Sequence, residues 1–326
     1  MSTPAAIQMA ARFKGQTLRL PNLKQLLAKW PNTMSPHYEE LKEIIEEKII
    51  EWISDEQSRT KARHVNLAFF CASWYPYITL DRLETIFRYS LFLFLWDDII
   101  EDSSISVRTV QQQALKYMEY HLGLCSSSTP EPPCPTKYCS LFQHCALALR
   151  TECTVVQRRR FLKQIKEYMA GCEVEQEYVL SGKIPSLKEY WDHRLYTSSV
   201  WTYCALADYM AGVNLPEEIY EMAEVKTLWL EQNRHIVILN DIMSFKKEID
   251  KSSFHSLIPV VSNETGADLD TVIASLIKSL VAAGDNLEKA LDGLVARVKG
   301  DVELETAVQK YAVGFRTNMT GNYWWS

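Results

Sequence analysis

The sequence predicts an all-α fold, a single helical bundle over residues 1–326. Glycine is scarce, at 11 of 326 residues, and no long stretch alternates apolar and polar residues with the period of two that marks a half-buried strand. Segments rich in leucine, alanine, glutamate and lysine instead repeat their apolar residues with the 3.6-residue period of a helix. A chain of this length can bury a large core and would by itself permit two domains, but the predominance of helical periodicity favours one large bundle.

Charge and cysteine usage narrow the class of protein. The formal net charge of −6 argues against nucleic acid as a partner. The eight cysteines are scattered and form no paired C-x-x-C arrangement with histidines, which argues against zinc. Residues 1–18 contain no apolar signal segment, and the densest apolar run, Leu91–Trp96, is too short to span a bilayer. We expect a cytoplasmic protein with reduced thiols and no membrane span.

The first part of the chain is expected to begin with a partly ordered segment, residues 1–33, which prolines punctuate. Residues 36–53 have the acidic and apolar faces of an amphipathic surface helix. A further helix is predicted over residues 60–75, ending at Pro76. Its aromatic side chains are expected to belong to the core.

Residues 80–102 combine a buried helix with a cluster of acids. The segment Tyr89–Trp96 is almost entirely apolar, as expected of a buried helix, and it leads directly into Asp97, Asp98 and Glu101. Asp97 and Glu101 are four residues apart and share a helix face, and carboxylates at a helix C-terminus are opposed by the helix dipole. A bound metal would offset the cost of that placement, so these acids are candidate metal ligands.

A surface loop divides the middle of the chain. Residues 125–139 are rich in proline and serine and cannot continue a helix. Helical periodicity resumes directly after them, so the loop is expected to connect parts of one domain. The run Arg158–Arg160 lies on the next predicted helix and is expected to face solvent.

A capping box and an arginine mark the next helix. Ser186 and Glu189 have the spacing of a capping box. Arg194 follows among tyrosines and tryptophans, where it either stacks on aromatic rings or points inward at an anion, and both alternatives stay open. The run Thr197–Ser199 is expected to break the helix, because short hydroxyl side chains compete for its backbone hydrogen bonds.

The strongest chemical signal lies in a helix predicted over residues 224–249. Asn240, Ser244 and Glu248 are spaced four residues apart and share one helix face. Their amide, hydroxyl and carboxylate oxygens are ligands that suit Mg²⁺. The preceding turns are apolar on nearly every side, which argues against a solvent-facing polar stripe. Lys247, beside Glu248, adds a cation for an anion that the metal also contacts.

Further helices are predicted over residues 268–296 and 301–320. Taken together, the stretches from about Phe69 to Ser326 resemble fungal-type class I terpene synthases. The resemblance depends on two motifs, on the arginine at position 194 and on the last residues of the chain.

The segment Asp97-Asp98-Ile99-Ile100-Glu101 is similar to the family's aspartate-rich D-D-x-x-E motif, and Asn240 to Glu248 is similar to its second metal motif, N-D-x-x-S-x-x-K-E. Arg194, which is 46 residues before Asn240, stands where the family has its diphosphate-sensing arginine. Gly321-Asn322-x-x-Trp325-Ser326 looks like the family's last helix. The resemblance implies a single helical bundle around a central cavity, with the two motifs on opposite walls of the cavity mouth.

The resemblance also implies the chemistry. A lyase of this kind, in secondary metabolism, ionises farnesyl diphosphate with the help of Mg²⁺ (three ions), cyclises the carbocation to a sesquiterpene and releases diphosphate. By this resemblance the metal ligands are Asp97, Asn240, Ser244 and Glu248, with Asp98 and Glu101 as weaker ones. Arg194 and Lys247 would contact the diphosphate, and Thr197 and Ser198 would relay its binding to the helix break. Phe94, one turn before Asp97, and Trp325 would form walls of the pocket.

Three alternatives stay open. A diterpene synthase would act on geranylgeranyl diphosphate, a chain-elongating prenyltransferase would carry a second aspartate-rich motif, and a helical prenyl-diphosphate-binding protein would be catalytically inactive. The family's Arg-Tyr pair, which hydrogen-bonds the diphosphate, does not follow Glu248, so either the sequence stops before that pair or the site has one anion contact fewer. The expected partner is a small-molecule prenyl diphosphate, and the chain is expected to be a monomer or a homodimer.

Overall fold

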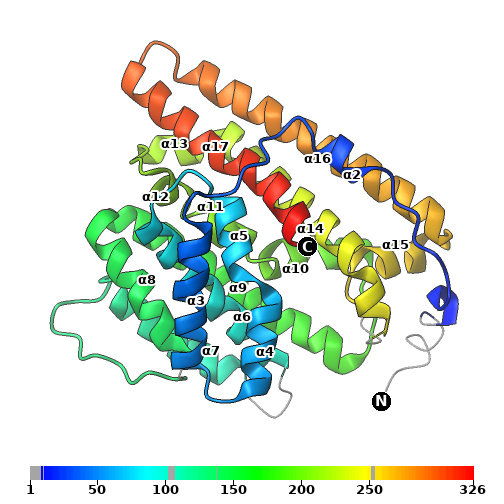
Figure 1. The fold of residues 1–326 in the computed structure, drawn as a ribbon, viewed down its shortest axis with the longest axis horizontal. Coiled ribbons are helices and arrows are strands. Elements are labelled where there is room, and N and C mark those ends of the chain that lie inside the picture. Colours follow the sequence, from blue (N-terminus) through cyan, green and yellow to red (C-terminus); the bar gives the residue numbers. More distant parts are fainter. Residues whose placement is uncertain (1–8, 10, 102–106, 137, 251–253) are drawn as a thin grey trace.

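The computed structural model describes residues 9, 11–101, 107–136, 138–250 and 254–326. Within these ranges the regular structure is helical and no strand occurs, so the all-α prediction is confirmed (Figure 1). In chain order the helices are α2 (Leu23–Leu26), α3 (Tyr38–Trp52), α4 (Glu56–Val65), α5 (Leu67–Trp74), α6 (Leu80–Glu101), α7 (Val107–His121), α8 (Cys139–Glu152), α9 (Val155–Ser181), α10 (Leu187–Thr197), α11 (Val200–Cys204), α12 (Ala207–Ala211), α13 (Glu217–Glu221), α14 (Ala223–Asp250), α15 (Leu257–Thr265), α16 (Leu269–Arg297) and α17 (Val302–Trp325).

Helix α14 is held by neighbours on several sides. It packs along α16 and also contacts α10, α11, α15 and α17. Its apolar side chains are largely buried, Val237, Leu239 and Ile242 among them, because a helix that is apolar on nearly every side needs partners all round. The prediction of a helix over residues 224–249 is confirmed to within one residue at each end. The polar residues in the last turns of α14 therefore project from a well-supported helix.

The prediction of one helix over residues 60–75 is wrong in one respect, because the structure has two helices there, α4 and α5. Asn66 separates them with a left-handed backbone at φ 53°, a conformation that asparagine tolerates better than most residues. Its side-chain oxygen accepts a hydrogen bond from the N–H of Phe69 at 3.4 Å and caps α5. The break directs α5 into the core, where Phe70 and Trp74 are buried.

The N-terminal segment, residues 11–35, crosses the outside of the bundle alongside α16 (Figure 1). Phe13 packs edge-to-face on Phe245 of α14, with ring centres 5.2 Å apart. Trp30 is buried against α16, where its Nε1 donates to Glu288 at 2.6 Å. These contacts join the start of the chain to the helix that carries the candidate metal ligands.

The prediction that the run Arg158–Arg160 faces solvent is wrong for its last member. The side chain of Arg160 is only 9% exposed, and its guanidinium pairs with the buried carboxylate of Asp208 at 2.7 Å. The same guanidinium lies over the ring of Tyr220. Because each residue turns a helix by about 100°, three consecutive arginines cannot share one face, and Arg160 falls on the side of α9 that meets α12 and α13.

The proline-rich stretch predicted as a loop connects α7 to α8 on the outside of the bundle (Figure 1). None of the eight cysteines, which all lie within the described ranges, forms a disulfide. Of the helices that the structure describes, none combines the length and the apolar content that crossing a bilayer requires.

Candidate active site

The polar face of α14 is organised around one carboxylate. Ser244 Oγ donates to Glu248 Oε1 at 2.6 Å, which confirms that residues four apart share this face. The second carboxylate oxygen, Glu248 Oε2, is buried and has no hydrogen-bond partner among the described residues. A buried oxygen without a donor is costly unless something else satisfies it. With the amide oxygen of Asn240 one turn before Ser244, the donor set fits a hard divalent cation.

The described residues contain no cluster of three His, Cys, Asp or Glu side chains suited to a metal. This agrees with the face on α14, where two of the three donors are an amide and a hydroxyl. The backbone of α6 is helical through Asp97, Asp98 and Glu101, but the side chains of residues 97–101 lie outside the described part of the structure. Their predicted role as metal ligands therefore stays a prediction.

Arg194 points across from α10 toward α14. Its Nη2 donates to Asn240 Oδ1 at 3.4 Å and lies 3.6 Å from Asp241 Oδ1. Burial opposes the charge, but the facing oxygens of Tyr190 and Asp241 outweigh that effect and raise the pKa of Arg194. Its Nε is buried and has no partner in the described ranges. Of the two alternatives left by the sequence, the structure therefore has Arg194 directed inward, with one donor still unused.

Asp241 is a residue that the sequence prediction did not single out. It is 1% exposed, it accepts a hydrogen bond from the Tyr190 hydroxyl, and it accepts another from the N–H of Leu257 at 2.7 Å. Burial raises its pKa to about 6, although Arg194 opposes that shift. Asp241 thus links α10, α14 and the start of α15 behind the polar face. The sequence signal that could have identified Asp241 is its position directly after Asn240, in a segment with the apolar Leu239 before it and Ile242 after it.

The predicted break after Thr197 is present. Helix α10 ends at Thr197, and Ser199 has a left-handed backbone at φ 60° before α11 begins. The capping box of Ser186 and Glu189 at the other end of α10 is also confirmed. The hydroxyl of Thr197 is buried and has no hydrogen-bond partner within the described residues. Because the carbonyl end of a helix carries partial negative charge, the end of α10 favours positive charge beside it.

Asn233 holds this break and was also missed. It is fully buried, its Nδ2 donates to the Leu195 carbonyl at 2.6 Å, and its Oδ1 accepts from Ser198 Oγ at 2.9 Å. The amide therefore replaces helical bonds that the break leaves unmade. Its signal in the sequence was an amide two turns before Asn240 on the same helix, in the polar run that precedes Ile236.

Arg194, Asn240 and the broken end of α10 meet at a cavity of about 200 Å³. Phe94 and Trp325 form part of its wall, with ring centres 5.8 Å apart and an edge-to-face geometry. Further aromatic side chains that line the cavity are Phe70, Trp74, Tyr168 and Tyr203. Aromatic faces of this kind attract a cation in a site from which water is excluded.

Trp325 is held in place by a close contact between α17 and α5. A Cβ atom at Gly321 would lie 2.9 Å from the Ser73 carbonyl oxygen, so a glycine is needed for this approach. Trp325 Nε1 then donates to the Val65 carbonyl at 2.6 Å. Lys247, by contrast, is exposed and does not line the cavity.

A protein-family model described as "Terpene synthase family 2, C-terminal metal binding" matches residues 88–283, more than half of the chain. This protein belongs to that terpene synthase family. The matched region runs from α6 into α16, so it includes both the acidic end of α6 and the polar face of α14.

Similarity to individual terpene synthases extends over nearly the whole chain. Sesquiterpene cyclase hepA of Aspergillus oryzae (strain ATCC 42149 / RIB 40) is 26% identical over 335 residues, which cover 98% of this chain and 89% of the relative. The 10-epi-cubebol synthase of Sorangium cellulosum (strain So ce56) is 23% identical, covering 93% of this chain and 96% of the relative. Among solved structures, a-eudesmol synthase matches the fold with a TM-score of 0.78 at 18% identity, covering 95% of this chain and 98% of that one.

The family and these relatives make this terpene synthase a lyase that acts on prenyl diphosphates. The family description includes metal binding, in agreement with the donor set on α14. The structural likeness independently supports the helical fold.

Proposed function

We propose that this terpene synthase catalyses the Mg²⁺-dependent ionisation of farnesyl diphosphate and its cyclisation to a sesquiterpene, with release of diphosphate. The observation that carries the proposal is the contact of Arg194 with Asn240, the first oxygen donor of the polar face of α14, at a cavity with an aromatic wall. The choice of farnesyl diphosphate is supported by the names of the relatives, which include a sesquiterpene cyclase and a "(+)-T-muurolol synthase ((2E,6E)-farnesyl diphosphate cyclizing)".

The residues that would hold Mg²⁺ are Asn240, Ser244 and Glu248 on α14, with Asp97 on α6, and Asp98 and Glu101 as weaker ligands. Glu248 Oε2, buried without a hydrogen-bond partner in the described residues, is the position that fits a cation best. When bound, three Mg²⁺ ions would neutralise charge on the diphosphate and make it a better leaving group.

Arg194 would bind the departing diphosphate. Its guanidinium is fixed by Asn240 and Asp241, and its unpaired Nε leaves a donor for a phosphate oxygen. Lys247 would add a second cation at the rim, from its exposed position on α14. As the bond between the allylic carbon and the diphosphate oxygen breaks, the negative charge that develops on that oxygen would move toward these cations.

The carbocation left behind would face the aromatic wall. Phe94 and Trp325 would stabilise it through their ring faces, each by roughly 0.5–2 kcal/mol. Thr197 and Ser198 would contribute through the carbonyl end of α10, which favours positive charge. A cavity of about 200 Å³ lined by apolar rings would keep water from the cation until cyclisation is complete.

The test is incubation of the purified protein with Mg²⁺ and, separately, geranyl, farnesyl and geranylgeranyl diphosphate, with analysis of the hydrocarbons by gas chromatography and mass spectrometry. We expect a cyclic product from farnesyl diphosphate that disappears with EDTA and returns with added Mg²⁺. Asn240→Ala should abolish turnover while circular dichroism stays that of a folded helical protein. Full activity of Asn240→Ala, or undiminished turnover in EDTA, would refute the assignment of α14. Binding of farnesyl diphosphate without any product would instead identify a catalytically inactive binding protein.

A further inference from the structure

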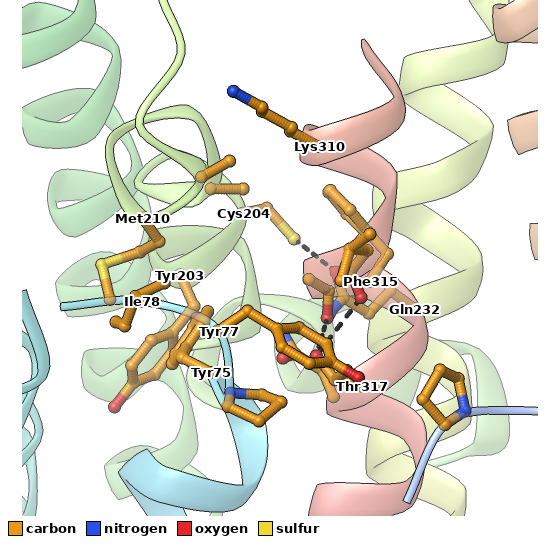
Figure 2. A pocket seen from close by; sticks show the side chains of 17 residues that line it. Tyr75, Tyr77, Ile78, Tyr203, Cys204, Met210, Gln232, Lys310, Phe315 and Thr317 are labelled. Carbon is orange, nitrogen blue, oxygen red and sulfur yellow. Dashed lines mark hydrogen bonds between the residues drawn. The ribbon is translucent and has the colours of Figure 1, made fainter. Parts of the chain in front are cut away.

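A second and larger cavity, of about 560 Å³, lies on the other side of Tyr203, and its lining includes the exposed Tyr77 and Lys310. Figure 2 shows its walls, which come from the connection between α5 and α6, from α11 and α12, and from α17. Its lining is largely apolar, with Ile78, Ala207, Met210, Val313 and Phe315 among the side chains. Nothing in the chemistry proposed above uses this cavity.

The two cavities follow one another along the same helices. On α14, Gln232 lines the second cavity, whereas Ile236 and Asn240 line the substrate cavity. On α17, Asn318 lines the second cavity and Asn322 the substrate cavity. Eight residues of helix correspond to about 12 Å, so the step from Gln232 to Asn240 is short. The second cavity is therefore the continuation of the substrate cavity away from the metal and diphosphate residues.

Tyr203 is the side chain that both cavities share. In α11, Val200 lines only the substrate cavity and Cys204 only the second one, while Tyr203 between them lines both. The Tyr203 side chain is almost fully buried. Figure 2 shows Tyr203 near Tyr75 among the side chains that line the second cavity.

The Tyr203 ring is held firmly between the cavities. Its hydroxyl forms a hydrogen bond with Ser90 Oγ at 2.9 Å. Its ring packs against three aromatic neighbours, with ring centres 5.8 Å from Phe70, 5.6 Å from Trp74 and 5.5 Å from Tyr89. A buried ring with this many contacts does not move aside at low cost.

We propose that Tyr203 sets the upper limit of the prenyl chain length by closing the inner end of the substrate cavity. The second cavity is then an apolar site of the right chemistry for the last isoprene unit of a longer chain, and it becomes reachable when the ring is removed. The inference rests on the proposed function, because it takes the substrate to be a prenyl diphosphate with its charged end at Arg194 and Asn240.

The first test is binding rather than turnover. Isothermal titration with Mg²⁺ and the unreactive farnesyl and geranylgeranyl thiolodiphosphates compares the wild-type protein with Tyr203→Ala. We expect the wild type to prefer the farnesyl analogue and Tyr203→Ala to bind the geranylgeranyl analogue at least about tenfold more tightly than the wild type does. Because Tyr203 also lines the substrate cavity, its removal affects the farnesyl analogue too, and the quantity compared is the ratio of the two affinities, which should shift toward the geranylgeranyl analogue by at least about tenfold.

Two matched variants show whether loss of the Tyr203 ring, and access to the second cavity, cause the change in preference. Tyr203→Phe keeps the ring and removes the hydroxyl that bonds Ser90, so it should keep the wild-type preference. Ala211→Phe fills the second cavity from α12, so it should leave the wild-type preference unchanged and cancel the gain when combined with Tyr203→Ala. If Tyr203→Ala does not fold by circular dichroism, Tyr203→Leu takes its place, because it shortens the side chain while keeping it apolar.

A folded variant that binds the farnesyl analogue without a gain for the geranylgeranyl analogue would overturn the inference. Equal wild-type affinities for the two analogues would overturn it as well. A wild-type protein that binds the farnesyl analogue but makes no product from farnesyl diphosphate would refute the proposed function alone, since the ratio of affinities still tests Tyr203. A wild-type protein that binds neither analogue would count against both.

Discussion

Substitution of Asn233 tests which side-chain contacts stabilise the backbone at the break between α10 and α11. We expect Asn233→Ala to lower the free energy of unfolding by about 2–3 kcal/mol. The buried amide bonds the Leu195 carbonyl at 2.6 Å and Ser198 Oγ at 2.9 Å, and each bond whose buried partner is left unpaired costs about 1–3 kcal/mol. The sum stays low in that range because Ser198 Oγ also lies 3.3 Å from the Leu195 carbonyl, so its hydroxyl can partly replace the lost donor.

Urea unfolding followed by circular dichroism measures this loss, and Ser198→Ala is the matched variant. It removes one of the two bonds and should cost about 1 kcal/mol. The double variant should lose less than the sum of the single ones, because both residues belong to one network. Since Arg194 directly precedes Leu195, Asn233→Ala should also raise the KM for the prenyl diphosphate. A loss below about 1 kcal/mol for Asn233→Ala, or strict additivity, would refute the reasoning.

Three further outcomes are expected. Burial lowers the pKa of His235 to about 3, so only the unfolded chain takes up the proton as the pH falls below about 6.5, and the free energy of unfolding declines from there toward pH 3. His235→Phe should avoid about 2 kcal/mol of the loss between pH 7 and pH 5, as measured by urea unfolding. Identical losses in both proteins would contradict this. Phe94→Ala and Trp325→Ala should change the product mixture in gas chromatography while binding of diphosphate persists; an unchanged mixture would remove both rings from the cation wall. Asp208→Ala should destabilise the protein by about 3–5 kcal/mol, because the nearly buried Arg160 loses one of its two carboxylate partners and keeps only Glu217 among the described residues, and because Gln157 and Tyr220 lose their acceptor. An unaltered melting temperature would show that the pair contributes nothing.

The helices near the site were predictable where local pattern determines them. The apolar periodicity before Asn240 predicted α14, and the spacing of Ser186 and Glu189 predicted the start of α10. The spacing of Asn240, Ser244 and Glu248 also predicted their common face, because a helix fixes which residues are neighbours within it.

What could not be predicted depends on partners that are distant in sequence. Asp241 is important because Tyr190 and Leu257 converge on it, and the burial of Arg160 follows from Asp208 on another helix. The division between the two cavities is likewise invisible in the sequence, since Tyr203 looks like an ordinary core aromatic residue until the walls on both sides of it are known. Spacing within one helix contains no information about such contacts.

The contacts of the N-terminal segment determine when during synthesis the protein can finish folding. Arg12 donates to the Gly266 carbonyl, and Thr320 donates to the Pro31 carbonyl, so the segment with Arg12 and Pro31 depends on partners 254 and 289 positions later in the chain. A ribosome releases those partners long after residues 12 and 31, and until then the segment lacks these native contacts. Closing such long loops is slow compared with forming local helices. Helix α14 can therefore form its local hydrogen bonds before the segment that packs against it has its later partners, and a nascent chain without α17 lacks both the contact of Thr320 with Pro31 and the indole of Trp325.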